Sequence, residues 1–320
     1  MNAAIEIQNL KKIYKNGLEA LKGITLSIPI GSFYGLLGPN GAGKTTTIGI
    51  VTGLVKITSG SATIMGHDSV INFRKARKLI GLSPQELNLD VFFSIEELLV
   101  LQAGYYGLSH SDAKDRAALM LQQFGLTEKR KSRSRELSGG MKRRVQIAKA
   151  LVHDPPIIIL DEPTAGVDIE LRHMLWEYLR KINKMGKTIL LTTHYIEEAE
   201  QLCDTVSIID NGNIITTDSP KKLTKDHGMS GLEITISSST ENINLSSWNY
   251  IINDGIINVD TVHPEKDMAD IISQISNQGC AIENVSIYRS TLEDVFKKLT
   301  GKSLKDEADS VDNNKEVLDV

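Results

Sequence analysis

The sequence predicts an α/β protein that binds its ligand at one edge of a parallel sheet. Two short apolar runs, residues 32–38 and 157–160, have the composition of buried strands. A glycine-rich loop follows the first run, and two carboxylates follow the second. Because α/β sheets place their ligands at the carboxyl ends of their strands, these two segments are the first candidates for a functional site.

The glycine-rich loop has the spacing of a phosphate-binding loop, with Gly38, four further residues, and then Gly43, Lys44 and Thr45. The glycines allow backbone N–H groups to surround phosphates at the positive end of the helix that follows. Lys44 would reach the β- and γ-phosphates, and Thr45 would offer its hydroxyl to Mg²⁺. The candidate nucleotide-binding residues here are Gly38, Pro39, Asn40, Gly41, Ala42, Gly43, Lys44, Thr45 and Thr46. The predicted helix has its apolar positions at Ile48, Val51 and Leu54.

Asp161 and Glu162 directly follow the second apolar run. Asp161 would hold Mg²⁺ through water, and Glu162 would orient and polarise a water molecule that attacks the nucleotide. The alternative is a strand that ends in ordinary surface acids. The phosphate-binding loop upstream favours the catalytic interpretation.

A second helix start that is suited to binding phosphate lies between the glycine-rich loop and Asp161. The segment RELSGGMKRRVQIAKAL predicts an amphipathic helix that begins after Ser138, Gly139 and Gly140. The serine hydroxyl and the glycine N–H groups are suited to a phosphate, although serine is also a common N-cap residue. Two phosphate-binding helix starts with one pair of carboxylates point to a site that is shared between two chains.

The composition restricts the classes of function. A chain of 320 residues favours two domains, and a net charge of −4 implies no broad polyanion-binding surface. Cys203 and Cys280 are too few for a disulfide framework or a structural zinc site. No segment approaches the ~18 apolar residues that a membrane helix needs, so any membrane part of a larger assembly would belong to another chain.

The C-terminal part predicts a small α+β domain. It contains two strand-like segments, a hairpin around residues 253–255 and two helices. The first helix begins at Pro264, and the second is predicted to carry a capping box formed by Ser290 and Glu293. The predicted domains are therefore residues 1–220 for nucleotide binding and residues 221–301 for the α+β domain, followed by a disordered acidic tail over residues 302–320.

The ordered motifs resemble the ATP-binding subunit of an ABC transporter over about residues 1–220. LSGGM resembles the LSGGQ signature of that family, with Met141 in place of glutamine. The resemblance implies that Tyr14 stacks on adenine, that Gln85 contacts Mg²⁺ and water, and that His194 contacts the γ-phosphate. It implies that Asp168 belongs to the loop that crosses between subunits. The family fold is a P-loop NTPase with a RecA-like core, an antiparallel β subdomain and a helical subdomain.

Four further segments resemble ATPase subunits of drug- and polysaccharide-type exporters, with YadG-type ATPases as the nearest type. They are GGMKRR, DEPTAGVDIELR, LTTHYIEEAE and LEDVFKKLTG. The resemblance implies a head-to-tail homodimer with ATP and Mg²⁺ at the interface, and a separate integral membrane permease that holds the dimer at the cytoplasmic face of the membrane. Residues 86–126 should form the helical subdomain that receives the permease. The candidates for its apolar seat are Val91, Phe92, Phe93, Tyr105 and Tyr106.

Other functions stay open at this point. An ABC importer ATPase with a regulatory C-terminal domain would share every core motif. Soluble ABC proteins that act on ribosomes normally carry two cassettes, and those that repair DNA carry long coiled coils; neither feature is present, so no nucleic-acid partner is expected. A small-molecule P-loop kinase would leave Ser138 and the two glycines after it without a role.

Overall fold

The computed structural model describes residues 3–164, 167–228, 230–237, 243–245 and 247–302. The chain forms two compact units, of which the first ends at Ser219 and the second begins at Pro220. The predicted tail, residues 302–320, lies outside the described residues except for Lys302. No helix in the described part of the chain is long and apolar enough to cross a membrane.

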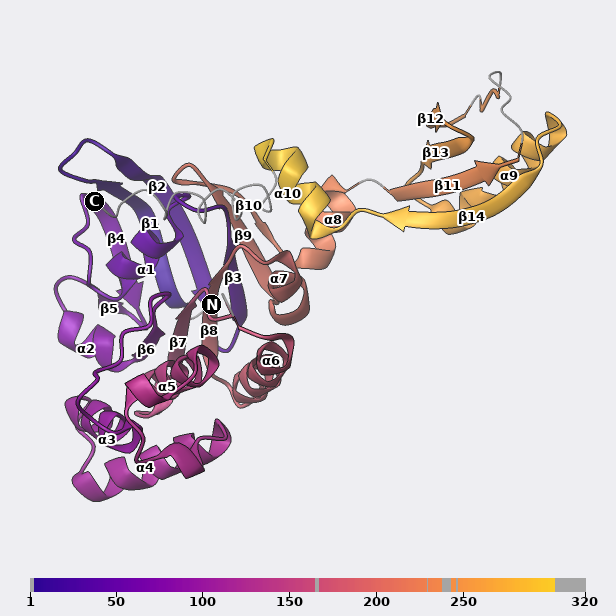
Figure 1. The fold of residues 1–320 in the computed structure, drawn as a ribbon. Coiled ribbons are helices and arrows are strands. Elements are labelled where there is room, and N and C mark those ends of the chain that lie inside the picture. Colours follow the sequence, from indigo (N-terminus) through magenta and orange to yellow (C-terminus); the bar gives the residue numbers. More distant parts are fainter. Residues whose placement is uncertain (1–2, 165–166, 229, 238–242, 246, 303–320) are drawn as a thin grey trace, which may run out of the picture. The chain divides into compact units, whose positions relative to one another are not determined.

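A six-stranded sheet forms the centre of the first unit (Figure 1). Its strands are β3 Phe33–Leu37, β6 Ile80–Ser83, β7 Ile157–Asp161, β8 Thr188–Thr193, β9 Thr205–Asp210 and β10 Asn213–Asp218. They lie in the order β10-β9-β3-β8-β7-β6, and only β9 and β10 pair antiparallel. Every residue of β3, β7 and β8 is buried, as expected for parallel strands with both faces covered.

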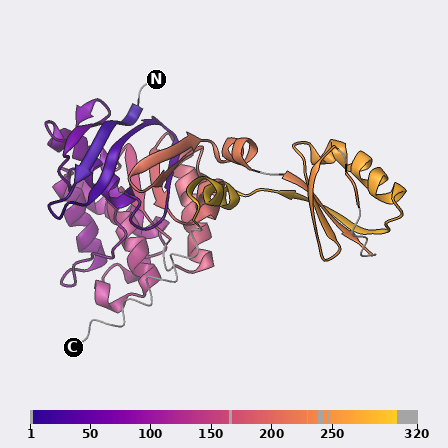
Figure 2. The same cartoon turned by 90° about the horizontal axis from the view of Figure 1, so that it is seen from above.

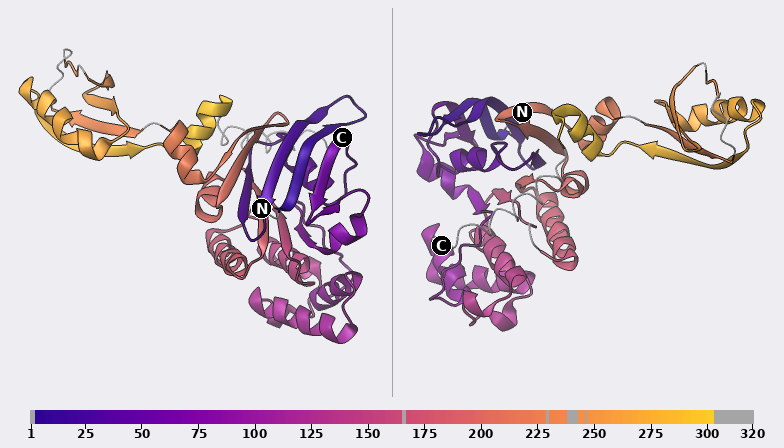
Figure 3. Two further views of the ribbon diagram at one scale, coloured as in Figure 1. Left: turned by 180° about the vertical axis from the view of Figure 1, so that it is seen from behind. Right: turned by 45° about the horizontal axis from the view of Figure 1, so that its top comes forward.

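Five helices surround this sheet (Figures 1 and 3). They are α1 Lys44–Val51, α2 Phe73–Lys78, α5 Gly139–Leu151, α6 Ile169–Lys184 and α7 Ile196–Leu202. Helix α5 packs on β6, whereas α6 and α7 pack on β8. The prediction that Leu54 continues the apolar face of α1 is wrong. The helix ends at Val51, Gly53 turns the chain with a φ of 70°, and Leu54 is 70% exposed.

A four-stranded antiparallel sheet covers α1 from the other side. It consists of β1 Ala3–Ile13, β2 Glu19–Pro29, β4 Ser59–Ile64 and β5 His67–Asp68, in the order β2-β1-β4-β5. Ile5 and Ile7 of β1 share one core with Ile48 of α1 and Ile159 of β7. The helix that follows the glycine-rich loop is therefore held between two sheets, which fixes the position of the loop.

The predicted helical subdomain is also present. Helices α3 Ile95–Tyr105 and α4 His110–Gln123 pack on each other and on α5, and the short helices η1 Thr127–Lys129 and η2 Ser134–Glu136 lead into α5. Residues 86–94 are not helical, because Ser94 forms a capping box with Glu97 and so starts α3. The ring of Tyr106 stacks on His153 with 3.4 Å between ring centroids.

The second unit contains its own antiparallel sheet, with one face covered by α9 (Figure 2). Its elements are α8 Pro220–His227, β11 Ser230–Ile236, β12 Asn249–Asn253, β13 Ile256–Asp260, α9 Pro264–Asn277, β14 Ile282–Arg289 and α10 Leu292–Thr300. The strand order is β12-β13-β11-β14. Asp254 and Gly255 both have positive φ, 45° and 80°, which is the geometry of a two-residue hairpin turn. The predicted hairpin is thus confirmed.

The predicted capping box of the last helix is displaced by one residue. Thr291, not Ser290, is the N-cap of α10, and its partner is Asp294 instead of Glu293. The hydroxyl of Thr291 accepts from the N–H of Asp294 at 3.3 Å, and the carboxylate of Asp294 accepts from the N–H of Thr291 at 2.8 Å. The sequence TLED satisfies the same pattern as STLE, and the tertiary position of the helix decides between them.

Replacing Thr291 by Ala should destabilise the start of α10 by about 1 kcal/mol, because one capping hydrogen bond is lost. Amide hydrogen exchange in the first turn of α10 should then become about fivefold faster. The Thr291→Ser variant keeps the hydroxyl and serves as the matched control. Unchanged exchange in Thr291→Ala, or equal acceleration in both variants, would contradict the assignment of the cap.

Candidate nucleotide-binding site

A hollow of about 410 Å³ lies over the glycine-rich loop. Its walls come from the β1–β2 connection, the loop, the start of α1 and the ends of β6 and β7. The lining residues are Tyr14, Leu18, Ala20, Pro39, Asn40, Gly41, Gly43, Lys44, Thr45, Thr46, Gln85 and Glu162. The structure thus brings together most of the residues that the sequence predicts for nucleotide binding. Gly38 and Ala42 are buried within the loop.

At two positions of the phosphate-binding loop, only glycine fits, because other backbone atoms lie too close for a side chain. A Cβ atom on Gly38 would lie 2.2 Å from the carbonyl oxygen of Ile209. Gly43 has a φ of 112°, and a Cβ atom there would lie 2.9 Å from the carbonyl oxygen of Ala20. Gly43 is the N-cap of α1 and has no side chain to cap the first turn. This helix start therefore suits an anion.

The ammonium group of Lys44 is held at the inner wall of the hollow. Its Nζ atom donates to the carbonyl oxygens of Gly38 at 2.7 Å and Pro39 at 3.0 Å. It also forms an ion pair with Oε1 of Glu162 at 3.3 Å, and both side chains are 4% exposed. A single positive charge thus bridges the loop and the end of β7.

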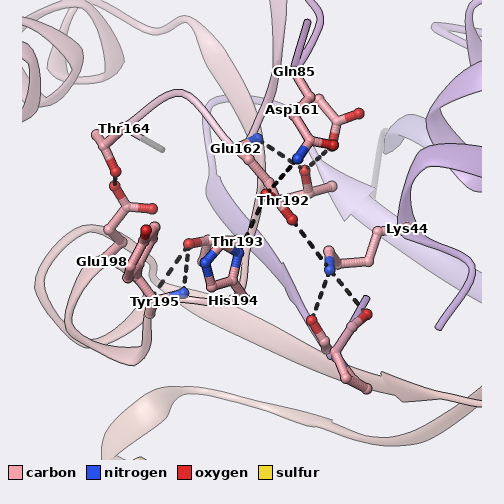
Figure 4. Close-up of polar contacts among 12 residues, drawn as sticks. Lys44, Gln85, Asp161, Glu162, Thr164, Thr192, Thr193, His194, Tyr195 and Glu198 are labelled. Carbon is pink, nitrogen blue, oxygen red and sulfur yellow. Dashed lines mark hydrogen bonds and ion pairs between the residues drawn. The ribbon is translucent and has the colours of Figure 1, made fainter. Parts of the chain in front are cut away.

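The carboxylate of Glu162 is contacted from two further loops (Figure 4). The amide of Gln85, after β6, donates to Oε2 at 3.0 Å. Nδ1 of His194, after β8, lies 3.2 Å from the same oxygen. Burial opposes ionisation of Glu162, but the contact with His194 and the charge of Lys44 outweigh burial and lower its pKa. The predicted catalytic residues Glu162, Gln85 and His194 are therefore in direct contact.

Asp161 lies behind Glu162 at the end of β7. Thr192, its neighbour on β8, donates a hydrogen bond from its hydroxyl to Oδ1, and Thr45 also hydrogen-bonds the side chain. Burial and the charge of Glu162 nevertheless raise the pKa of Asp161. A nearby cation would offset this electrostatic cost of ionisation. Asp161, the hydroxyl of Thr45 and the amide oxygen of Gln85 are oxygen donors of the kind that Mg²⁺ prefers, so these residues fit the ion.

Tyr14 occupies the outer part of the hollow, at the β1–β2 connection. Its hydroxyl lies 3.2 Å from Oγ1 of Thr46, and Nζ of Lys12 lies 4.8 Å from the centre of its ring. The ring is therefore held beside the phosphate-binding loop.

The signature residues do not line this hollow. Ser138 is the N-cap of α5, its hydroxyl accepts from the N–H of Met141 at 3.3 Å, and both Ser138 and Gly139 are exposed. Asp168 is the N-cap of α6, and its Oδ1 accepts from the N–H of Leu171 at 2.8 Å. An ideal Cβ on Gly140 would lie 3.9 Å from Oδ2 of Asp168, so the two helix starts are neighbours. One chain therefore holds two separate groups of predicted ligand-binding residues.

Two residues near the carboxylates have no individual role in the sequence prediction. Thr192 contacts both Asp161 and the N–H of Glu162, and Arg143 contacts the backbone of Glu162. Thr192 precedes His194 by two residues, and Arg143 lies within the signature helix. Position beside a recognised motif is the only signal that could have indicated them.

A phosphate-binding loop after β3, between the two sheets, with buried carboxylates at the end of β7, two strands away, is the arrangement of an ATP-binding cassette. Residues 21–165 match the ABC transporter family. The linearmycin resistance ATP-binding protein LnrL of Bacillus subtilis (strain 168) is 36% identical over 311 residues, which cover 94% of this chain and 100% of that protein. A Nod factor export ATP-binding protein I of Rhizobium sp. (strain N33) is 36% identical over 307 residues, 94% of this chain and 98% of that protein.

Solved structures agree with this assignment. The ATP-binding subunit of an ABC transporter is 31% identical, with a TM-score of 0.66 over 70% of this chain and 93% of that one. A dimeric post-hydrolysis state of the cassette MJ0796 bound to ADP and Pi is 29% identical, with a TM-score of 0.63 over 67% of this chain and 98% of that one. The chain therefore belongs to the ATP-binding subunits of ABC transporters, and it is an enzyme that binds and hydrolyses ATP.

The position of Tyr14 leads to a test of adenine stacking. We expect Tyr14→Ala to weaken ATP binding by about 5- to 150-fold, because loss of an aromatic platform costs about 1–3 kcal/mol per base. Tyr14→Phe keeps the ring and should bind within about twofold of the wild type. Titration with a fluorescent ATP analogue measures both. Wild-type affinity in Tyr14→Ala would exclude stacking by this residue.

Proposed function

We propose that the chain is the ATPase subunit of an ABC exporter and drives a separate membrane permease. The observation that carries the proposal is the match to LnrL, named for linearmycin resistance, and to a Nod factor export protein over 94% of this chain. The match includes the second unit as well as the cassette. The narrower YadG-type assignment stays a prediction.

Hydrolysis would be carried out by the residues around Glu162. The carboxylate of Glu162 would polarise the attacking water, and its lowered pKa keeps it ionised as a base requires. His194 would contact the γ-phosphate, and Lys44 would exchange part of its contact with Glu162 for the β- and γ-phosphates. Mg²⁺ held by Thr45, Gln85 and, through water, Asp161 would supply charge stabilisation at the phosphates.

Head-to-tail dimerisation would complete the site. The hollow over Lys44 is open and is not lined by Ser138 of the same chain. In the proposed dimer, the signature residues of one chain cover the ATP that is bound to the other, with Asp168 in the crossing loop. This C₂ arrangement forms two equivalent sites. The solved structure of the cassette MJ0796 is a dimer bound to ADP and Pi, which supports dimerisation.

The permease would contact the helical subdomain at the cytoplasmic face of the membrane. Phe92 is 77% exposed and Tyr105 is 83% exposed, and Val91 and Phe93 are also exposed. These four side chains remain candidates for the apolar seat. Tyr106 is half-buried and stacks on His153 instead, which removes it from the candidates.

Replacing Glu162 by Gln should reduce ATP turnover by ~10²–10⁴-fold, which is the typical contribution of a positioned base. ATP affinity should change little, because the amide keeps the shape and most contacts of the carboxylate. Steady-state phosphate release and nucleotide titration measure the two quantities. Glu197→Gln, an exposed position on α7, is the matched control. Near-normal turnover in Glu162→Gln would remove this residue from the role of base.

Mixing two inactive variants tests the shared site. Lys44→Ala disables the phosphate-binding loop, and Ser138→Arg places a bulky cation at the signature. Each homodimer then has two damaged sites. A heterodimer has one intact site, formed by Lys44 of the Ser138→Arg chain and Ser138 of the Lys44→Ala chain, so the mixture should regain ATPase activity that neither variant shows alone.

Crosslinking should report ATP-dependent heterodimers in the same mixture. Because heterodimers form by association, the regained activity should rise with protein concentration. Turnover that is independent of protein concentration, by a chain that stays monomeric with ATP, would overturn the head-to-tail site.

A further inference from the structure

Arg143 is a buried arginine one turn into α5, and it is bonded entirely to backbone carbonyl groups of two other segments. Its side chain is 4% exposed. Nη1 donates to Pro84 O at 3.0 Å and to Gln85 O at 2.9 Å. Nε donates to Pro163 O at 2.8 Å, and Nη2 donates to Glu162 O. One side chain therefore joins the loop after β6 to the end of β7.

These carbonyls belong to the residues whose side chains meet in the nucleotide site. Glu162 has a φ of 48°, a left-handed conformation that is uncommon for a residue with a side chain. Its N–H donates to Thr192 O at 3.1 Å, while its carbonyl accepts from Arg143. The peptide on each side of Glu162 is thus anchored, by β8 on one side and by α5 on the other.

Gln146 reinforces the contact one turn further along α5. Its Nε2 donates to Pro84 O at 2.6 Å and to Glu86 O at 2.8 Å. The carbonyls of Pro84, Gln85 and Glu86 are therefore all held by one face of the signature helix. The amide of Gln85 can then reach Oε2 of Glu162 from a fixed backbone.

We propose that Arg143 is a positioning residue that fixes Glu162 and Gln85 in the nucleotide site of its own chain. In the proposed head-to-tail dimer, the first residues of α5 contact the ATP that is bound to the other chain. The second test below uses that dimer, so it rests on the proposed function. Arginine suits the role because its planar guanidinium directs five N–H donors in a fixed geometry. A lysine ammonium cannot span the same four carbonyls.

The first test separates turnover from binding. Arg143→Met should lower kcat at least tenfold and change KM less than threefold, because Arg143 does not line the hollow. Arg143→Lys should recover kcat only in part. Arg144→Met, on the same helix and with one side-chain hydrogen bond to the described residues, to Phe124 O at 3.5 Å, is the matched control and should stay within twofold. Wild-type kcat in Arg143→Met, or an equal loss in Arg144→Met, would overturn the proposal.

Thermal unfolding and nucleotide titration accompany these measurements. Arg143→Lys keeps the charge and most of the length of the side chain, so it provides a folded comparison if Arg143→Met unfolds. A folded Arg143→Lys protein that binds ATP with wild-type affinity should still show reduced kcat. Full wild-type kcat in that protein would overturn the need for the guanidinium.

The second test asks which site Arg143 serves, using the mixture of Lys44→Ala and Ser138→Arg chains. Arg143→Met on the Ser138→Arg chain, which supplies Lys44 and Glu162 of the intact site, should abolish at least nine-tenths of the regained activity. The same change on the Lys44→Ala chain, which supplies the signature side of the intact site, should leave it within twofold. Equal losses from both placements, or the reverse order, would overturn the proposal. If the starting mixture shows neither regained activity nor ATP-dependent heterodimers, the head-to-tail dimer fails, and the kcat of the Arg143 variants still decides the positioning role.

Discussion

The buried charge of Glu162 is the constraint on which the nucleotide site depends. A carboxylate that is 4% exposed is costly unless it is paired. Lys44 supplies the opposite charge, and Gln85 and His194 supply further polar contacts to the same group. These partners come from three different segments that follow β3, β6 and β8. The need to balance one charge therefore holds together the phosphate-binding loop and two other loops of the sheet edge.

The layered fold supplies the rigidity that this arrangement needs. Helix α1 lies between the parallel and antiparallel sheets in a shared core, so the position of Lys44 is set by packing on both sides. Helix α5 carries the signature at its first turn and bonds the backbone of Glu162 one turn later. In the proposed dimer, a single helix would thus contact the ATP of one site and support the base of the other.

Some sequence patterns predicted the correct segment of the structure, and others predicted a neighbouring position. Patterns with several required residues in series, such as the phosphate-binding loop and the hairpin at Asp254 and Gly255, identified the correct segments because their backbone geometry demands those residues. Patterns that fit the sequence equally well at two adjacent positions did not identify the correct residue. The cap of α10 lies at Thr291, one residue after the predicted position, and Tyr106, a candidate for the apolar seat beside Tyr105, is half-buried against His153.

The sequence by itself determined the α/β class and the residue types at the ends of β3 and β7. Those properties follow from local spacing and apolar periodicity, which a linear pattern records. Only the tertiary structure placed Gln85 and His194 on one carboxylate, Thr192 beside Asp161, and Arg143 against four carbonyls. These contacts join residues 19 to 77 positions apart in the chain, and those of Arg143 also depend on which way α5 faces. The order of strands in the sheet and the packing of α5 decide them, because no short stretch of sequence specifies which distant segments become neighbours.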